Sequence, residues 1–131
     1  MIKYVRGAIW WANLDDAGSK ETRAVQKNRP VLIVSNNDYN ANHSTLTVLP
    51  ITHTAPSDGE KDFRVSIDTS SPGREDVSYV MCDQIRLIDK KDLENFYGVV
   101  SDWEMLNVQL VLMGYLDIDM SVYKVNNDEQ A

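Results

Sequence analysis

Short apolar runs of the length of β-strands occupy the first ninety residues of the chain, and turn-forming residues separate them. The stretch 63–68 has the clearest pattern, because Phe63, Val65 and Ile67 alternate with polar residues as in a strand with one buried face. By the same criteria we expect strands over residues 7–14, 31–34, 46–52, 63–68, 77–82 and 84–88.

Prolines and asparagines mark the ends of these runs. Pro30 stands at the first residue of a strand, where a missing N–H is tolerated. Pro50 lies inside the run 46–52 and predicts an edge strand or a bulge there. The asparagine-rich stretch 36–40 predicts a turn.

The hydrophobic period changes at Ser101, which begins a capping box with Glu104 and predicts a helix from 101 to about 116. Few positions of this helix are polar. A helix that is apolar nearly all round is usually buried on more than one side, which in so small a chain indicates a dimer. A broad apolar stripe on one side is the alternative.

Strands followed by one terminal helix predict a mainly β fold with α. We expect an SH3-like, partly open β-barrel of five to seven short strands with a C-terminal helix. The length of 131 residues suits one domain. We assign residues 1–118 to this domain and 119–131 to a polar, acidic tail.

Acidic residues outnumber basic ones, and the formal net charge is −7. This total argues against a general binder of nucleic acids or anionic membranes. The charge is uneven, however, because residues 1–54 hold six basic and four acidic side chains. The segment Gly18–Arg29 holds four basic residues and one acidic residue, so it could bind phosphates; a solvated loop is the alternative.

The location predicted from the sequence is the cytoplasm. No apolar run is long enough to cross a membrane, and residues 1–6 lack the apolar stretch of a signal peptide. Cys82 is the only cysteine, so we expect no internal disulfide and no cysteine-rich zinc site. With only two histidines, His43 and His53, we expect no metal and no cofactor.

Neighbouring tryptophans in the first predicted strand should face opposite ways. We expect one of Trp10 and Trp11 in the core. The other could stack on a base or pack in a dimer contact. Of these two roles, we prefer packing. Cys82 should be a buried strand residue, since nothing near it in the sequence would activate a thiol.

A cation and a hydroxyl stand at two strand ends. Arg29 begins one predicted strand and Thr52 ends another. Such groups suit phosphodiester chemistry, in which fixed donors stabilise the charge that grows on the phosphate oxygens. The residues alone do not show that the two side chains meet. A salt bridge at a strand edge is the alternative for Arg29, and a plain strand-end hydroxyl for Thr52.

Several motifs occur in the order known from one family of toxins. They are Arg6–Trp11, Gly18-Ser19, Arg29–Asn36, Leu49–Thr52 and Cys82–Lys90. Together with the order of strands and helix, they resemble the MazF/PemK (Kid) family of toxin ribonucleases, from residue 6 to about 116.

This resemblance implies a homodimer with the partly open barrel fold. It also implies metal-independent, sequence-specific cleavage of single-stranded RNA, as in an mRNA interferase. The products would carry a 2′,3′-cyclic phosphate and a 5′-hydroxyl. The implied partner is a cognate, MazE-like antitoxin, which would cover the RNA groove with an acidic disordered segment.

The resemblance also assigns roles to individual residues. Arg29 matches the catalytic arginine of the MazF branch, and Thr52 matches its companion. Asp83 matches a proposed general base of the Kid branch, and Gln84 resembles a position that contacts RNA. With Asp83 and Gln84, we take Lys20, Lys27 and His53 as candidate substrate-binding residues. The alternative for His53 is an exposed histidine without a partner. The alternative for Asp83 is a carboxylate that accepts hydrogen bonds within a turn.

Two departures from the family pattern affect these assignments. The segment between Ser19 and Arg29 has no glycine and is longer than is usual in the family. No arginine lies between Val77 and Cys82, so we do not expect a pair of Asp83 with an arginine in the Kid manner. A non-catalytic toxin of the same fold, such as a CcdB-like gyrase poison, is the alternative function.

Overall fold

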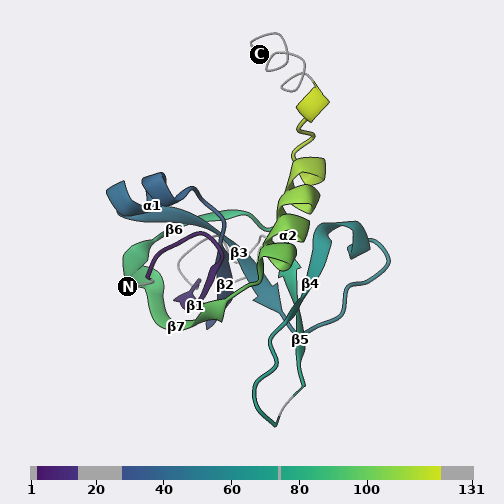
Figure 1. The fold of residues 1–131 in the computed structure, drawn as a ribbon, viewed down its shortest axis with the longest axis horizontal. Coiled ribbons are helices and arrows are strands. Elements are labelled where there is room, and N and C mark those ends of the chain that lie inside the picture. Colours follow the sequence, from purple (N-terminus) through teal and green to yellow (C-terminus); the bar gives the residue numbers. More distant parts are fainter. Residues whose placement is uncertain (1–2, 15–27, 74, 122–131) are drawn as a thin grey trace.

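A computed structural model describes residues 3–14, 28–73 and 75–121 of the chain. Seven antiparallel strands form one curved sheet, and a helix packs on the side from which a long hairpin projects (Figure 1). The strands are β1 (Ala8–Asn13), β2 (Asn28–Ile33), β3 (Thr45–Thr52), β4 (Arg64–Asp68), β5 (Val77–Met81), β6 (Arg86–Asp89) and β7 (Leu93–Val99). The helices are α1 (Asn37–Asn42) and α2 (Asp102–Tyr115), with single 3₁₀ turns at η1 (Lys61–Phe63) and η2 (Lys90–Asp92).

The strand order is β4-β5-β3-β2-β1-β7, and β6 pairs with β3 beside β5. The sheet curves strongly without closing. The predicted fold class, mainly β with a C-terminal helix, is therefore confirmed, as are the expected strands and the terminal helix. One strand, β7, was not predicted, because only Leu93 of its seven residues is buried and the pattern carries little alternation.

The asparagine-rich stretch after β2 forms the short helix α1, so the predicted turn was wrong. Asn36 caps this helix, since its Oδ1 accepts hydrogen bonds from the backbone N–H groups of Asp38 and Tyr39 at 2.7 and 3.4 Å. Asn40 is buried and donates to the carbonyl of Ser35 at 2.9 Å. Side-chain hydrogen bonds of asparagine thus begin and anchor a helix here as readily as they form a turn.

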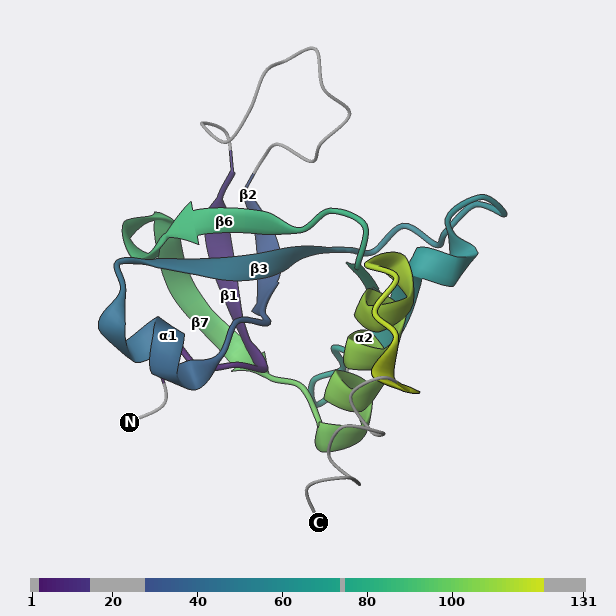
Figure 2. The ribbon, with the colours of Figure 1, turned by 90° about the horizontal axis from the view of Figure 1, so that it is seen from above.

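Pro50 lies on a central strand, not on the edge strand or bulge that was predicted. Its neighbour on one side is β2, where Val31 pairs with Pro50. On the other side, β6 pairs with residues 45–48 of β3 and β5 pairs with residues 51–52. Pro50 therefore falls where β3 changes partners, at a point where no ladder hydrogen bond needs its missing N–H. Figure 2 shows β3 running across the molecule, with β6 beside its first part.

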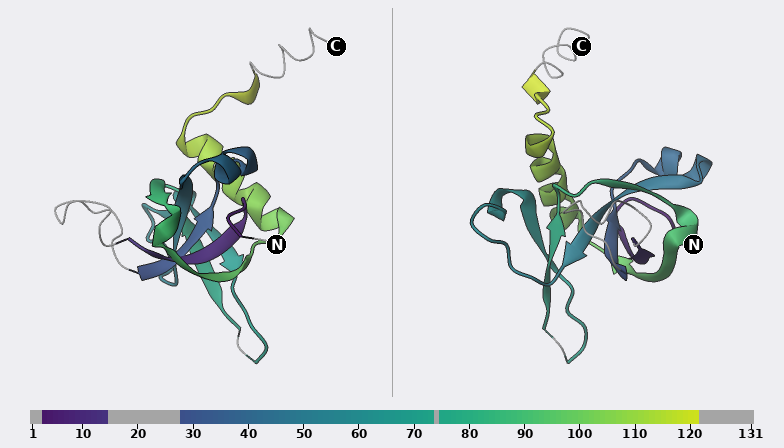
Figure 3. Two further views of the ribbon diagram at one scale, coloured as in Figure 1. Left: turned by 90° about the vertical axis from the view of Figure 1, so that its left-hand side faces the viewer. Right: turned by 180° about the vertical axis from the view of Figure 1, so that it is seen from behind.

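Two hydrophobic clusters fill the fold. One lies inside the barrel and includes Trp10, which is 9% exposed. The other lies between the sheet and α2 and includes Ile51 and Val108. Trp11 is 38% exposed on the opposite face of β1, so the predicted division between the two tryptophans is confirmed. β4 and β5 contribute Val65, Ile67 and Val80 to this second cluster, and the far end of their hairpin projects from the rest of the molecule (Figure 3).

Within a single chain, only one side of the helix α2 is buried. Val108 and its neighbours Met105, Val111 and Leu112 pack against the second cluster. Trp103, Leu106 and Leu110 stay exposed along another face of the helix. In the described ranges, no helix is long and apolar enough to cross a membrane.

Glu104 joins the start of α2 to the end of β4. The predicted capping box is present: Ser101 Oγ accepts from the Glu104 N–H at 3.1 Å, and Glu104 Oε1 accepts from the Ser101 N–H at 2.9 Å. The other carboxylate oxygen of Glu104 accepts from the backbone N–H of Asp68 at 2.6 Å. One carboxylate therefore satisfies backbone donors of both the helix and the hairpin.

Replacing Glu104 by Ala should destabilise the protein by about 2 kcal/mol, since hydrogen bonds to a charged group contribute about 1.5–3 kcal/mol. The measurement is the free energy of unfolding in urea. Asp102→Ala, in the first turn of the same helix, is the matched control and should have a smaller effect. Equal losses in the two variants would contradict the role given to the Glu104 carboxylate.

Candidate functional site

Arg29 and Thr52 lie at the same end of two neighbouring strands. Val31 of β2 pairs with Pro50 of β3, and extending this antiparallel register by two residues brings Arg29 opposite Thr52. Both residues line one cavity of about 310 Å³, which we name the Arg29 hollow. Its lining residues are Trp11, Asn28, Arg29, Pro30, Ile51, Thr52, His53 and Thr54.

The guanidinium of Arg29 is partly removed from water. Its Nε is buried and has no hydrogen-bond partner among the described residues. Burial lowers the pKa of Arg29 below its ordinary value, because a low-dielectric surrounding disfavours the charged form. Guanidinium groups nevertheless remain protonated in proteins, so the hollow contains a desolvated cation that an anion would stabilise.

The hydroxyl of Thr52 has a fixed position. Its Oγ1 accepts a hydrogen bond from the backbone N–H of Thr54 at 3.2 Å, as in a turn that ends a strand. The hydroxyl proton can still be donated to a ligand. The hollow thus contains both a cation and a hydroxyl donor. The sequence alone did not show that these two groups share a site.

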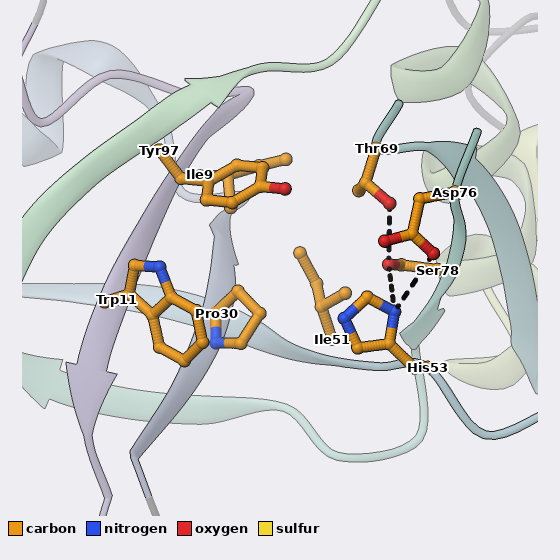
Figure 4. A pocket seen from close by; sticks show the side chains of 9 residues that line it. All are labelled: Ile9, Trp11, Pro30, Ile51, His53, Thr69, Asp76, Ser78 and Tyr97. Carbon is orange, nitrogen blue, oxygen red and sulfur yellow. Dashed lines mark hydrogen bonds and ion pairs between the residues drawn. The ribbon is translucent and has the colours of Figure 1, made fainter. Parts of the chain in front are cut away.

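A second cavity of about 290 Å³ adjoins the first, and we name it the Tyr97 hollow. It shares Trp11, Pro30, Ile51 and His53 with the Arg29 hollow. Its remaining lining residues are Ile9, Thr69, Asp76, Ser78 and Tyr97. Figure 4 shows the two aromatic rings on one side of the open space and the polar side chains on the other.

His53 connects the end of β3 to the β4–β5 hairpin. Its Nδ1 lies 3.1 Å from Ser78 Oγ and 3.7 Å from Asp76 Oδ1. Ser78 Oγ in turn lies 2.9 Å from Thr69 Oγ1. His53 therefore interacts with neighbouring polar groups, unlike the unpartnered histidine considered as the alternative from the sequence. It also lines both hollows.

Asp83 and Gln84 do not line either hollow. Asp83 Oδ1 accepts a hydrogen bond from Arg64 Nη1, and Arg64 Nη2 lies 3.0 Å from Glu60 Oε2. The backbone N–H of Gln84 donates to the carbonyl of Met81 at 3.1 Å, in the turn after β5. Asp83 therefore has an arginine partner, and that partner comes from β4 and not from the residues just before Asp83.

The pairing of Asp83 with Arg64 follows from the register of two strands. Arg64 pairs with Met81 across β4 and β5, so its side chain reaches the residues just after β5. A search for arginines near Asp83 in the sequence misses a partner nineteen positions away. Lys20 and Lys27, the other candidate substrate-binding residues, lie outside the described residues.

Cys82 is fully buried, as predicted. Burial raises the pKa of its thiol to about 12, with a smaller contribution in the same direction from the negative charge of Asp83. The thiolate is the reactive form, and at neutral pH almost none is present. No group of three or more His, Cys, Asp and Glu side chains that could hold a metal ion occurs in the described part of the chain.

The fold and the hollows together define an open, helix-bearing β-barrel protein with a cationic site at its strand ends. Residues 5–116 match the family of PemK-like, MazF-like toxins of type II toxin–antitoxin systems. The chain therefore belongs to this family, and the resemblance inferred from the motifs is confirmed.

Solved structures of similar fold include toxins from mycobacteria and from Deinococcus radiodurans. The chain is 26% identical to the Mycobacterium tuberculosis toxin MazF-mt6, covering 86% of this chain and 98% of that chain with a TM-score of 0.67. It is 23% identical to a mycobacterial endoribonuclease solved in complex with its cognate antitoxin, covering 88% and 96% with a TM-score of 0.67. MazF from Deinococcus radiodurans is 21% identical, with coverage of 87% and 96% and a TM-score of 0.69.

Asp83→Asn should lower the free energy of unfolding by about 2 kcal/mol, because it removes the charged acceptor of a hydrogen bond to Arg64. The Arg64 side chain is only 7% exposed, so water cannot fully replace that acceptor. Urea denaturation measures the change, and Asp62→Asn, an exposed carboxylate on η1, is the control. A change below about 0.5 kcal/mol in Asp83→Asn would contradict a structural role for the pair.

The thiol of Cys82 should react slowly with a disulfide reagent at pH 8 in the folded protein, because its raised pKa keeps it protonated there. Unfolding in urea should restore the ordinary pKa and make the reaction fast. Since the chain has one cysteine, the unfolded protein is its own control. A fast reaction in the folded state would show that the thiol is accessible and ionised.

Proposed function

We propose that this toxin is a metal-independent, sequence-specific endoribonuclease that cleaves single-stranded RNA, including mRNA. The observation that carries the proposal is the desolvated guanidinium of Arg29 beside the hydroxyl of Thr52 in one hollow. The endoribonucleases among proteins of similar fold support it further.

In the proposed reaction, the ribose 2′-oxygen attacks the adjacent phosphorus and the bond from phosphorus to the 5′-oxygen breaks. The 2′-hydroxyl loses its proton and the leaving 5′-oxygen gains one. The products are a 2′,3′-cyclic phosphate and a 5′-hydroxyl. Negative charge grows on the non-bridging oxygens, where fixed donors stabilise the transition state more than the ground state.

Arg29 suits the electrostatic part of this reaction. An arginine has a pKa above about 12 and is a poor proton acceptor, so we assign to Arg29 the stabilisation of charge. Thr52 donates a hydrogen bond to a non-bridging phosphate oxygen in the same transition state. His53 lines the same hollow, so its ring is placed to exchange a proton with the bound nucleotide.

The proposal extends to the partners. The toxin would act in the cytoplasm as a homodimer, and a cognate, MazE-like antitoxin with an acidic disordered segment would inhibit it. The exposed apolar residues Trp103, Leu106 and Leu110 of α2 support a further protein contact. The mycobacterial endoribonuclease of similar fold was solved with its antitoxin, which supports the same kind of partner here.

Arg29→Ala should lower kcat for RNA cleavage by about 100-fold or more, and Thr52→Val by about 10-fold, because each removes a donor to the developing charge. The assay follows cleavage of single-stranded RNA in EDTA and identifies the product ends. Lys91→Ala and Thr45→Val are matched controls, since Lys91 lies in η2 and Thr45 at the other end of β3.

Intact RNA with the wild-type protein, or full activity of Arg29→Ala, would overturn the proposed function. Inhibition of gyrase with RNA left intact would instead favour the non-catalytic alternative.

A further inference from the structure

We infer that the Tyr97 hollow binds one unpaired nucleobase of the RNA, next to the phosphate that lies in the Arg29 hollow. This inference rests on the proposed function and adds to it the side chains that select a base. The residues that would contact the base are Trp11 and Tyr97 on one wall and His53 and Thr69 on the other, where the buried Ser78 links the last two.

The aromatic wall offers exposed ring surface. Trp11 and Tyr97 are 38% and 47% exposed, although rings of this size usually find cover in a folded protein. They come from the neighbouring strands β1 and β7, and Pro30 continues the wall on β2. Stacking on such rings is available to every base, because each base has a π-face.

The polar wall is held in a fixed arrangement. Hydrogen bonds at 2.9 and 3.1 Å link Thr69 to Ser78 and Ser78 to His53 Nδ1. With Nδ1 on that side, the other ring nitrogen of His53 is on the opposite side of the ring, next to Ile51 (Figure 4). A ring nitrogen and hydroxyl groups held in this way can pair with the polar edge of a base.

The charge of the hollow fits a base better than a second phosphate. Among the described residues that line it, Asp76 is the acidic side chain and none is Lys or Arg. Asp68 and Glu75 line the adjoining surface of the same hairpin together with Asp76. These carboxylates would repel a phosphate, whereas a base is neutral and its amino groups can donate to acidic oxygens.

The position of the hollow fits one nucleotide that spans both cavities. Trp11, Pro30, Ile51 and His53 line both, so the two hollows adjoin. His53 follows Thr52 directly in the chain. A nucleotide with its phosphate at Arg29 and Thr52 can therefore extend its base between the two walls of the Tyr97 hollow.

The test is a cleavage map of a random RNA library, read from the 5′-hydroxyl ends. The wild type should prefer particular bases at one position next to the cut. Thr69→Val should reduce that preference by about 10-fold, because one contact to the edge of the base is lost. Tyr97→Ala should instead lower kcat/KM by about 10-fold for every sequence, because stacking does not depend on which base is bound. Phe96→Ala is the matched control, since Phe96 is also 47% exposed on β7 but packs against Trp10.

An unchanged base preference in Thr69→Val, or an unchanged kcat/KM in Tyr97→Ala, would overturn the inference even if RNA is cleaved. If the wild type cleaves no RNA, the proposed function fails. Titration with the four nucleosides still tests whether the Tyr97 hollow binds a base. Millimolar nucleoside should shift the NMR signals of the Trp11 indole and the His53 ring in the wild type and much less in Tyr97→Ala. No shift with any of the four nucleosides would overturn the inference.

Discussion

The change of partners along β3 is the constraint on which the rest of the structure depends. The first part of β3 pairs with β6, its last part pairs with β5, and Pro50 lies where one neighbour gives way to the other. The sheet therefore divides into a barrel, which encloses one hydrophobic cluster, and a hairpin, which shares the second cluster with strands of the barrel and with α2. Both hollows lie near the end of β3, and in the Tyr97 hollow residues of the barrel and of the β4–β5 hairpin face one another.

This arrangement explains how an acidic protein can still present a site for an anion. The net charge of −7 reduces long-range attraction to RNA, and screening at physiological salt acts over roughly 8 Å. The net charge of the whole molecule has little effect on phosphate binding at Arg29, because the Arg29 Nε is already removed from water. The energy gained when a phosphate replaces the lost hydration is local, so binding should rest on the hollow and not on the overall charge of the molecule.

The sequence predicted the elements whose signals are local. Alternation identified β4, and the capping box of Ser101 and Glu104 identified the start of α2. It missed β7, whose exposed residues show no period, and it mistook the Asn36-capped helix for a turn. Arg29 and Thr52 were predicted, but only the register of β2 and β3 brings them together. Arg64, Tyr97 and the pair Thr69 and Ser78 were missed because strand pairing between distant segments, which no local pattern reports, creates their contacts.

With the proposed roles, the two hollows would separate cleavage from base selection in the chain. Arg29 and Thr52 stand on β2 and β3, whose pairing is buried in the centre of the sheet and tolerates little change. Thr69 and Ser78 stand on or next to the strands of the β4–β5 hairpin, an arm at the end of the strand order. Substitutions in the hairpin can alter the polar wall without disturbing the central pair. His53 is the link between them, because it follows Thr52 and bonds to Ser78. A toxin built in this way can change the RNA sequence that it recognises while its reacting groups stay the same.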